Sequence, residues 1–177
     1  MGYHPYDQPS MRNESAPYQT EVAHRMTASI TLSRAAPSDA PAIRQLVRAA
    51  YAKWVPLMGR EPKPMLADYD LAVREHEVDL VYVDGTLAAL IELILHPDHL
   101  FIENLAVAPG HQRLGLGRRL LAHAEVRAKA LGLAEMRLLT AQAMAGNAAF
   151  YQSVGYRVTR TEPFKGGFTV YMSKDLV

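Results

Sequence analysis

The stretch Ala108–Leu121, APGHQRLGLGRRLL, decides the fold, because it lies where a predicted strand ends and a predicted helix begins. Gly115 and Gly117 stand at the start of that helix, although a glycine inside a helix costs ~1 kcal/mol relative to alanine. The first turn of a helix leaves backbone N–H groups unpaired, and these groups bind anions together with the positive end of the helix dipole. Glycines allow an anion to approach closely, and three neighbouring arginines add positive charge. The stretch therefore predicts a phosphate- or pyrophosphate-binding loop.

Two common nucleotide motifs do not fit this loop. The dinucleotide fingerprint G-x-G-x-x-G needs a third glycine, and that position holds Leu120. The P-loop needs Gly-Lys followed by Ser or Thr, a sequence that the chain does not contain. The motif that remains is Gln112–Gly117, QRLGLG.

The residues before the loop predict a three-stranded antiparallel meander. Val78–Val83 and Thr86–Leu95 are rich in β-branched and aliphatic residues, and Asp84-Gly85 between them is a strong signal for a tight hairpin turn. His96-Pro-Asp-His99 forms the next turn, and Leu100–Ala108 is the third strand. His96 and His99 are interpreted as polar turn residues, and no metal site is predicted.

The remaining elements predict helices around a mixed sheet. A strand at 30–34 and a helix capped by Ser38 precede the meander, and a loop with a short helix at 69–74 lies between them. A helix over 115–131, a strand over 134–140 and a short helix over 147–154 follow the meander. Strands at 156–161 and 168–173 end the chain. This order predicts an α/β (α+β) layer fold. If the strands at 100–108 and 134–140 are adjacent and parallel, the crossover between them must be right-handed.

Composition narrows the function classes. The chain has 177 residues, a formal net charge of +1 and no cysteine. We expect a disordered tail over residues 1–29, with Met26 as a candidate natural start, and one domain over residues 30–177. Near-neutral charge argues against nucleic-acid binding, and no apolar run or signal-peptide pattern indicates a membrane or secreted protein. A cytoplasmic location is the expectation.

The loop motif and its surroundings resemble the GNAT superfamily of N-acetyltransferases. Gln112–Gly117 is similar to the family's acetyl-CoA signature, and ENLAVAP at Glu103–Pro109 resembles its fourth strand. Asn147-Ala-Ala-Phe-Tyr151, followed by Gly155-Tyr156, resembles its last conserved helix, and MSKDL at 172–176 its closing strand. The resemblance implies a mostly antiparallel sheet of six to seven strands with helices on both faces. It also implies transfer of an acetyl group from acetyl-CoA to a primary amine of a small molecule or protein.

The resemblance implies roles for particular residues. Tyr151 would protonate the departing thiolate, and Glu103 would accept the amine proton, with Glu92, Tyr69 and His76 as rivals for that role. The residues expected to bind the cofactor are Leu105, Ala106, Val107, Gln112, Arg113, Leu114, Gly115, Leu116, Gly117, Arg118, Asn147 and Tyr151.

Other interpretations stay open. The chain could be a non-catalytic acyl-CoA sensor, or an interaction protein whose loop is unused. Arg118 could lie on a solvated helix face, Asn147 could be a helix cap, and Tyr151 could be a packed aromatic residue. The acceptor pocket could include the aromatic residues Tyr51, Trp54 and Tyr69, and the carboxylates Asp68, Asp70, Glu92 and Glu103 would favour a cationic amine there. The acceptor itself is not predicted, and the resemblance allows a homodimer.

Overall fold

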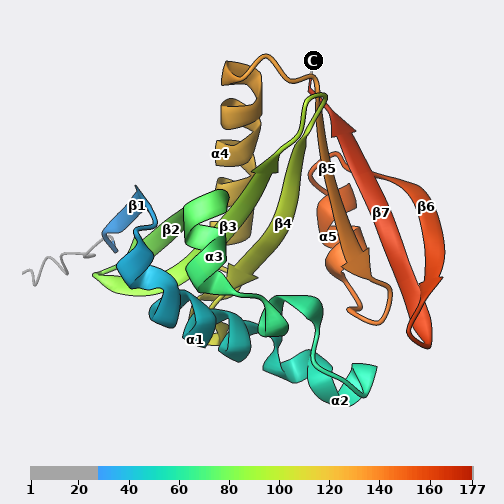
Figure 1. Ribbon diagram of the computed structural model, residues 1–177, viewed down its shortest axis with the longest axis horizontal. Helices are drawn as coiled ribbons and strands as arrows, with labels where there is room; N and C mark the ends of the chain where they lie inside the picture. Colours follow the sequence, from blue (N-terminus) through green and yellow to red (C-terminus); the bar gives the residue numbers. More distant parts are fainter. Residues whose placement is uncertain (1–27, 177) are drawn as a thin grey trace, which may run out of the picture.

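The computed structural model describes residues 28–176, and one seven-stranded sheet organises them (Figure 1). The strand order is β1-β2-β3-β4-β5-β7-β6. Every neighbouring pair is antiparallel except β4 and β5, which confirms the predicted mixed, mostly antiparallel sheet. The strands are β1 (Ile30–Arg34), β2 (Glu77–Val83), β3 (Thr86–Leu95), β4 (Leu100–Val107), β5 (Glu135–Ala141), β6 (Arg157–Phe164) and β7 (Gly167–Asp175).

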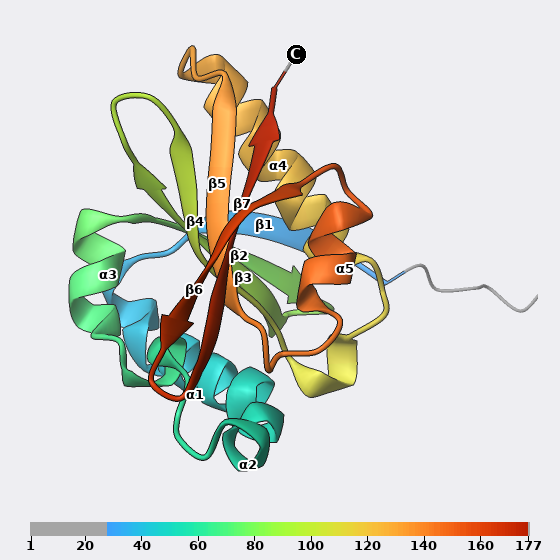
Figure 2. The same cartoon turned by 90° about the vertical axis from the view of Figure 1, so that its right-hand side faces the viewer.

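Helices cover both faces of the sheet, as predicted. Helices α1 and α3 pack on one face, and α4 packs against β3, β4 and β5 on the other. Figure 2 shows the sheet between α3 on one side and α4 and α5 on the other. The α-helices are α1 (Ala40–Tyr51), α2 (Val55–Met58), α3 (Tyr69–Glu75), α4 (Leu116–Ala130) and α5 (Asn147–Gln152).

The apolar spacing of the two long helices explains which side each one buries. In α1, Ile43, Leu46 and Val47 are buried at helical spacing against the sheet. In α4, Leu120 and Leu121 are among the buried residues that face the larger core cluster. Burial of these apolar side chains is the main driving force that holds the helices to the sheet.

The predicted meander is present as β2, β3 and β4. Asp84 and Gly85 have φ angles of 49° and 79°, the left-handed values that a two-residue hairpin turn requires. The predicted tail over residues 1–29 lies outside the described residues except for residues 28 and 29. Ser29 is hydrogen-bonded to the hairpin, because its N–H donates to Asp84 Oδ1 at 2.8 Å.

Local predictions differ from the structure at three places. Ser38 does not cap α1, because Pro37–Asp39 forms a 3-10 turn in which Asp39 accepts a hydrogen bond from the Ala36 N–H at 2.7 Å. Asn147 is the first residue of α5 and not its cap, a position that Gly146 takes at a φ of 88°. The predicted loop over 59–70 contains a 3-10 turn, Lys63–Leu66, and the residues between α1 and this loop form another 3-10 turn, Ala52–Trp54, and α2.

Candidate active site

The sheet opens between β4 and β5. These parallel strands pair only over Leu100–Ile102 and Met136–Leu138. Beyond this point β4 pairs with β3 alone and β5 pairs with β7 alone, and Figure 1 shows the two strands diverging. The backbone groups of 104–107 that face β5 therefore have no strand partner there. This separation gives an extended ligand a place to pair with main-chain groups.

A β-bulge lies at the point where the strands separate. Leu93 pairs with Ile102 and Glu92 pairs with Asn104, so Glu103 is an extra residue in β4. A bulge of this kind re-aims the side chains that follow it. Glu103 contacts Lys63 and Asn104 contacts Tyr51, so both side chains lie on the α1 face of the sheet.

A cavity of about 780 Å³ occupies the opening. Its walls come from β4, β5, α5, the end of α1, the segment 57–66 and the turn between β6 and β7. Four predicted site residues meet there: Glu103, Leu105, Asn147 and Tyr151. The other predicted cofactor residues, Ala106, Val107 and the loop 112–118, are not part of its wall. The predicted site thus consists of a cavity and, beyond the end of β4, a separate loop.

The loop 112–118 leads from the end of β4 into α4. Arg113 and Gly115 have φ angles of 65° and 77°, and α4 begins at Leu116. Within residues 28–176 none of the backbone N–H groups of 113–118 donates a hydrogen bond. Gln112 lies toward β4, where its Nε2 donates to the Val107 carbonyl at 3.3 Å. The loop therefore presents free donors at the positive end of a 15-residue helix.

The structure requires glycine at the two positions of the loop for different reasons. Gly115 needs its positive φ, whereas a Cβ added to it would meet nothing within 4 Å. A Cβ on Gly117 would lie 3.3 Å from Cζ of Phe150, so this glycine lets α4 pack closely against α5. Arg118 also contacts α5, because its Nη2 donates to Ser153 Oγ at 2.8 Å and its guanidinium lies over the Phe150 ring.

Tyr151 is the strongest candidate for an acid. It lines the cavity and is half-buried, and its ring contacts those of Phe150 and Tyr156. Burial raises the pKa of the Tyr151 hydroxyl to about 12. At neutral pH the hydroxyl is therefore protonated, and it forms no hydrogen bond with the residues that the structure describes. Asn147 on the same helix donates from Nδ2 to Thr140 Oγ1 at 3.3 Å.

The candidate bases differ in their access to the cavity. Glu103 lines it and accepts a hydrogen bond from Lys63 Nζ at 2.5 Å. Glu92 is buried outside the cavity wall and lies 2.6 Å from His76 Nδ1. Burial raises the pKa of Glu92, and the hydrogen bond to His76 opposes that shift. Glu103 is the only one of the four predicted cleft carboxylates that lines the cavity, because Asp68 caps α3 and Asp70 pairs with Arg44.

Asn104 is a residue that the sequence analysis missed. It is buried in β4, and its Oδ1 accepts a hydrogen bond from Tyr51 Oη at 2.8 Å. Its Nδ2 donates to Tyr69 Oη at 3.1 Å, and Tyr69 Oη donates to the Pro64 carbonyl at 2.7 Å. Burial is the main cause that raises the pKa of both tyrosines, so both remain protonated donors. An amide within a largely apolar strand was the available signal, since buried polar groups require partners.

The hydrogen bonds of Asn104 to Tyr51 and Tyr69 join α1, the bulged strand β4 and α3. Tyr51 and Asn104 line the cavity, whereas Tyr69 is buried and Trp54 is not part of the wall. Of the three aromatic residues predicted for an acceptor pocket, only Tyr51 therefore reaches the cavity.

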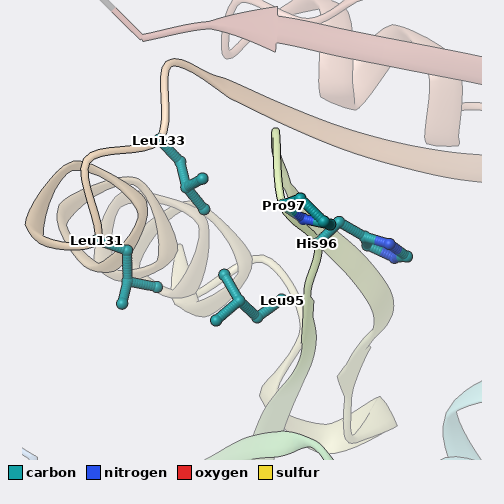
Figure 3. A pocket seen from close by; sticks show the side chains of 5 residues that line it. All are labelled: Leu95, His96, Pro97, Leu131 and Leu133. Atoms are coloured by element: carbon teal, nitrogen blue, oxygen red, sulfur yellow. The ribbon is translucent and has the colours of Figure 1, made fainter.

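A second hollow lies at the other end of β4. It has a volume of about 420 Å³ and is formed by the turn before β4 and the segment after α4 (Figure 3). Leu95, Leu131 and Leu133 make its wall largely apolar.

No group of His, Asp or Glu side chains within residues 28–176 could hold a metal ion. None of the helices in this part of the chain is long and apolar enough to cross a membrane.

The family model for the acetyltransferase (GNAT) family matches residues 41–156. The chain belongs to this family, which confirms the predicted resemblance. No curated protein matches the sequence.

Many solved structures share the fold. The ribosomal-protein-S18-alanine N-acetyltransferase of Escherichia coli is 22% identical, with a TM-score of 0.67 over 84% of this chain and 94% of that chain. The PaiA N-acetyltransferase of Thermoplasma acidophilum, in complex with coenzyme A, is 20% identical, with a TM-score of 0.70 over 83% and 99%. YncA of Salmonella typhimurium, a putative acetyltransferase with its cofactor acetyl-CoA, is 19% identical, with a TM-score of 0.65 over 84% and 95%. The family match and these neighbours bear out acetyl-CoA as the predicted acetyl donor.

Proposed function

We propose that this chain is an N-acetyltransferase that transfers the acetyl group of acetyl-CoA to a primary amine. The observation that carries the proposal is the early end of β4–β5 pairing at Ile102 and Leu138, beside a cavity that holds the Tyr151 side chain. The unpaired groups of β4 and the protonated hydroxyl of Tyr151 lie at this opening, and the free loop amides lie beyond the end of β4. A cytoplasmic location belongs to the proposal, since a chain without cysteine fits a reducing compartment.

The donor fits the groups that the chain offers. The free N–H groups of 113–118 would hold the diphosphate, and the backbone of Leu105, Ala106 and Val107 would pair with the amides of the pantetheine arm. Asn147, on the cavity wall, would contact the same arm. Bound acetyl-CoA supplies an activated carbonyl carbon, which becomes the amide carbon while coenzyme A leaves as the thiol.

Two side chains would move the protons. A protonated amine is no nucleophile, so Glu103 would accept the amine proton, directly or through a water molecule. Tyr151 would donate its proton to the departing sulfur, and its raised pKa keeps that proton available at neutral pH. The second proton of the amine, released from nitrogen as the amide forms, would restore the Tyr151 hydroxyl. The position of Glu103 on the cavity wall supports this choice over the buried Glu92.

The test is an acceptor screen that measures free coenzyme A with a thiol reagent. Because the chain has no cysteine, the reagent reports only coenzyme A. The Tyr151→Phe variant should lose about 10²-fold or more in kcat, the usual contribution of general acid catalysis, with an unchanged KM for acetyl-CoA. Tyr82→Phe, outside the cavity, is the matched control and should keep full activity.

Binding of coenzyme A separates the alternatives. A cofactor at a hundredfold excess over its Kd should stabilise the fold by about 2.7 kcal/mol. Stabilisation without turnover of any amine would favour the non-catalytic sensor, and absence of stabilisation would favour the interaction protein. An unimpaired Tyr151→Phe enzyme would remove Tyr151 as the acid.

A further inference from the structure

Exposed apolar side chains surround the entrance of the cavity. Leu57 and Leu66 are 66% and 69% exposed, and Phe164 and Phe168 are 49% and 48% exposed. The two leucines come from the segment after α1, and the two phenylalanines flank the turn between β6 and β7, yet all four line the same cavity. Figure 2 shows that turn beside the segment after α1, and a contact between Arg60 and the Phe164 ring joins them. Exposed apolar patches of this kind mark places where a ligand with an apolar surface binds.

The carboxylates of the cavity are already paired. Glu61 accepts a hydrogen bond from Arg48 Nη2 at 2.6 Å, and Glu103 accepts one from Lys63 Nζ at 2.5 Å. These are the two acidic side chains among the described residues that line the cavity. A second or third positive charge on an acceptor would therefore find no free carboxylate there.

Two cations at the entrance are, in contrast, available. Arg60 and Lys165 both line the cavity and lie over the Phe164 ring, with 5.4 Å and 5.3 Å between the charged group and the ring centroid. Within residues 28–176 neither forms an ion pair with a carboxylate. A cation on an aromatic face keeps its charge and can bind an anion from the open side.

We infer that the acceptor is a primary amine on an apolar body, with one acidic group at the end away from the amine. The inference rests on the proposed function and adds the substrate class. The amine would lie near Glu103 and Tyr151, the apolar body between Leu57, Leu66 and the two phenylalanines, and the acidic group at Arg60 and Lys165. Polyamines and other polycations are poor acceptors, because the charges at the entrance repel them.

Three amines test the inference with the full chain at saturating acetyl-CoA. They are 4-(2-aminoethyl)benzoate, 2-phenylethylamine, which lacks the carboxylate, and spermidine, a polycation. We expect kcat/KM to fall about tenfold from the first to the second, and further to the third. The double variant Arg60→Gln/Lys165→Gln should raise KM for the benzoate about tenfold and leave KM for phenylethylamine and acetyl-CoA unchanged.

The apolar wall is tested separately. Phe168→Ala should raise KM for both aromatic amines, whereas Leu95→Ala, which removes an exposed apolar side chain at the second hollow, should change neither. Spermidine as the best acceptor, or an unchanged ratio of the aromatic amines in the double variant, would overturn the inference while leaving amine acetylation intact. A Phe168→Ala variant that dissociates a dimer in light scattering, with KM unchanged, would overturn it as well, because the patch would then join two copies.

A binding measurement distinguishes failure of the inference from failure of the proposed function. Calorimetry with the coenzyme A-saturated chain should show binding of the benzoate that weakens about tenfold in the double variant. Such binding without release of coenzyme A from acetyl-CoA would contradict the proposed function, but it would support the inference that the cavity binds an apolar amine with an acidic group. Equal binding by the wild type and the double variant would contradict the role of the two cations.

Discussion

The hydrogen-bond chain through Asn104 gives the sharpest test of how the bulged strand is held. Asn104→Leu keeps the size of the side chain but removes both of its hydrogen bonds, to Tyr51 at 2.8 Å and to Tyr69 at 3.1 Å. Each bond contributes about 1 kcal/mol, and a buried hydroxyl left without a partner costs about 1–3 kcal/mol more. Tyr69 keeps its bond to the Pro64 carbonyl, so Tyr51 alone loses its partner. The two lost bonds and the unpartnered hydroxyl should therefore lower the free energy of unfolding by about 3–5 kcal/mol.

Urea unfolding followed by circular dichroism measures this change. The midpoint should fall while the slope with denaturant stays constant, since the fold itself is kept. For a chain of this size each kcal/mol corresponds to about 2–4 °C in Tm, so a thermal scan should show a drop of roughly 6–20 °C.

A double-mutant cycle with Tyr51→Phe isolates the bond from other effects of the substitution. Tyr51→Phe alone leaves Asn104 Oδ1 without its donor, and the double variant removes both partners. Replacement of both partners costs less than the sum of the single changes, so we expect a coupling energy of about 1 kcal/mol. Single-variant free energies that add to within about 0.5 kcal/mol would refute the hydrogen-bond account.

Three further substitutions test the loop, an ion pair and the core. Gly115→Ala should be about 1 kcal/mol less stable than Gly110→Ala, because only Gly115 has a positive φ and neither added Cβ meets an atom within 4 Å; equal thermal midpoints would contradict this. Arg127 donates two hydrogen bonds to Glu77 and is the main cause of that carboxyl's lowered pKa, so Arg127→Met should lower the free energy of unfolding by about 1 kcal/mol at pH 7. This loss should be present above about pH 4.5 and should shrink as the pH falls through the folded pKa of Glu77. A loss that grows in acid would refute the prediction. Leu120→Ala should cost about 2–5 kcal/mol in urea unfolding, because its side chain is fully buried, and a cost under 1 kcal/mol would show that the core closes around the gap.

The parts of the fold that sequence predicted best depend on local chemistry. Thr86–Leu95 was predicted with its observed bounds, because Asp84-Gly85 sets where the preceding turn ends. Helix α4 was predicted to within one residue at each end for a similar reason, since Gly115 and Gly132 stand on either side of it with left-handed φ angles. In each case the residue that ends the element lies beside it in the chain.

The segment between α1 and α3 was harder to predict because its helical turns depend on distant contacts. Pro56, Pro62 and Pro64 interrupt any helical spacing of apolar residues. Arg48 on α1 binds Glu61 at 2.6 Å, and Met65 is buried in the last of these turns. Short helices are stable in water only through such packing.

In the candidate site, too, the features set by neighbouring residues could be predicted, and those that depend on distant contacts could not. The free amides of the loop follow from the strand–glycine–helix sequence alone. The reason for Gly117 does not, because its neighbour Phe150 is 33 positions away in the chain and meets it only when α5 packs against α4. Asn104 was missed for a related reason, since its partners are on α1 and α3.

The bulge at Glu103 explains why the neighbouring β4 residues Asn104 and Leu105 lie on the faces of the sheet where they are found. Leu100 and Ile102 belong to the core cluster under α4, and Leu105 packs against the same cluster, although regular alternation would turn Leu105 to the opposite face. The extra residue shifts the alternation by one, so Asn104 reaches α1 while Leu105 returns to the α4 face. The bulge also coincides with the end of β4–β5 pairing at Ile102. One inserted residue therefore accounts both for the opening that the donor would occupy and for the position of Glu103 beside it.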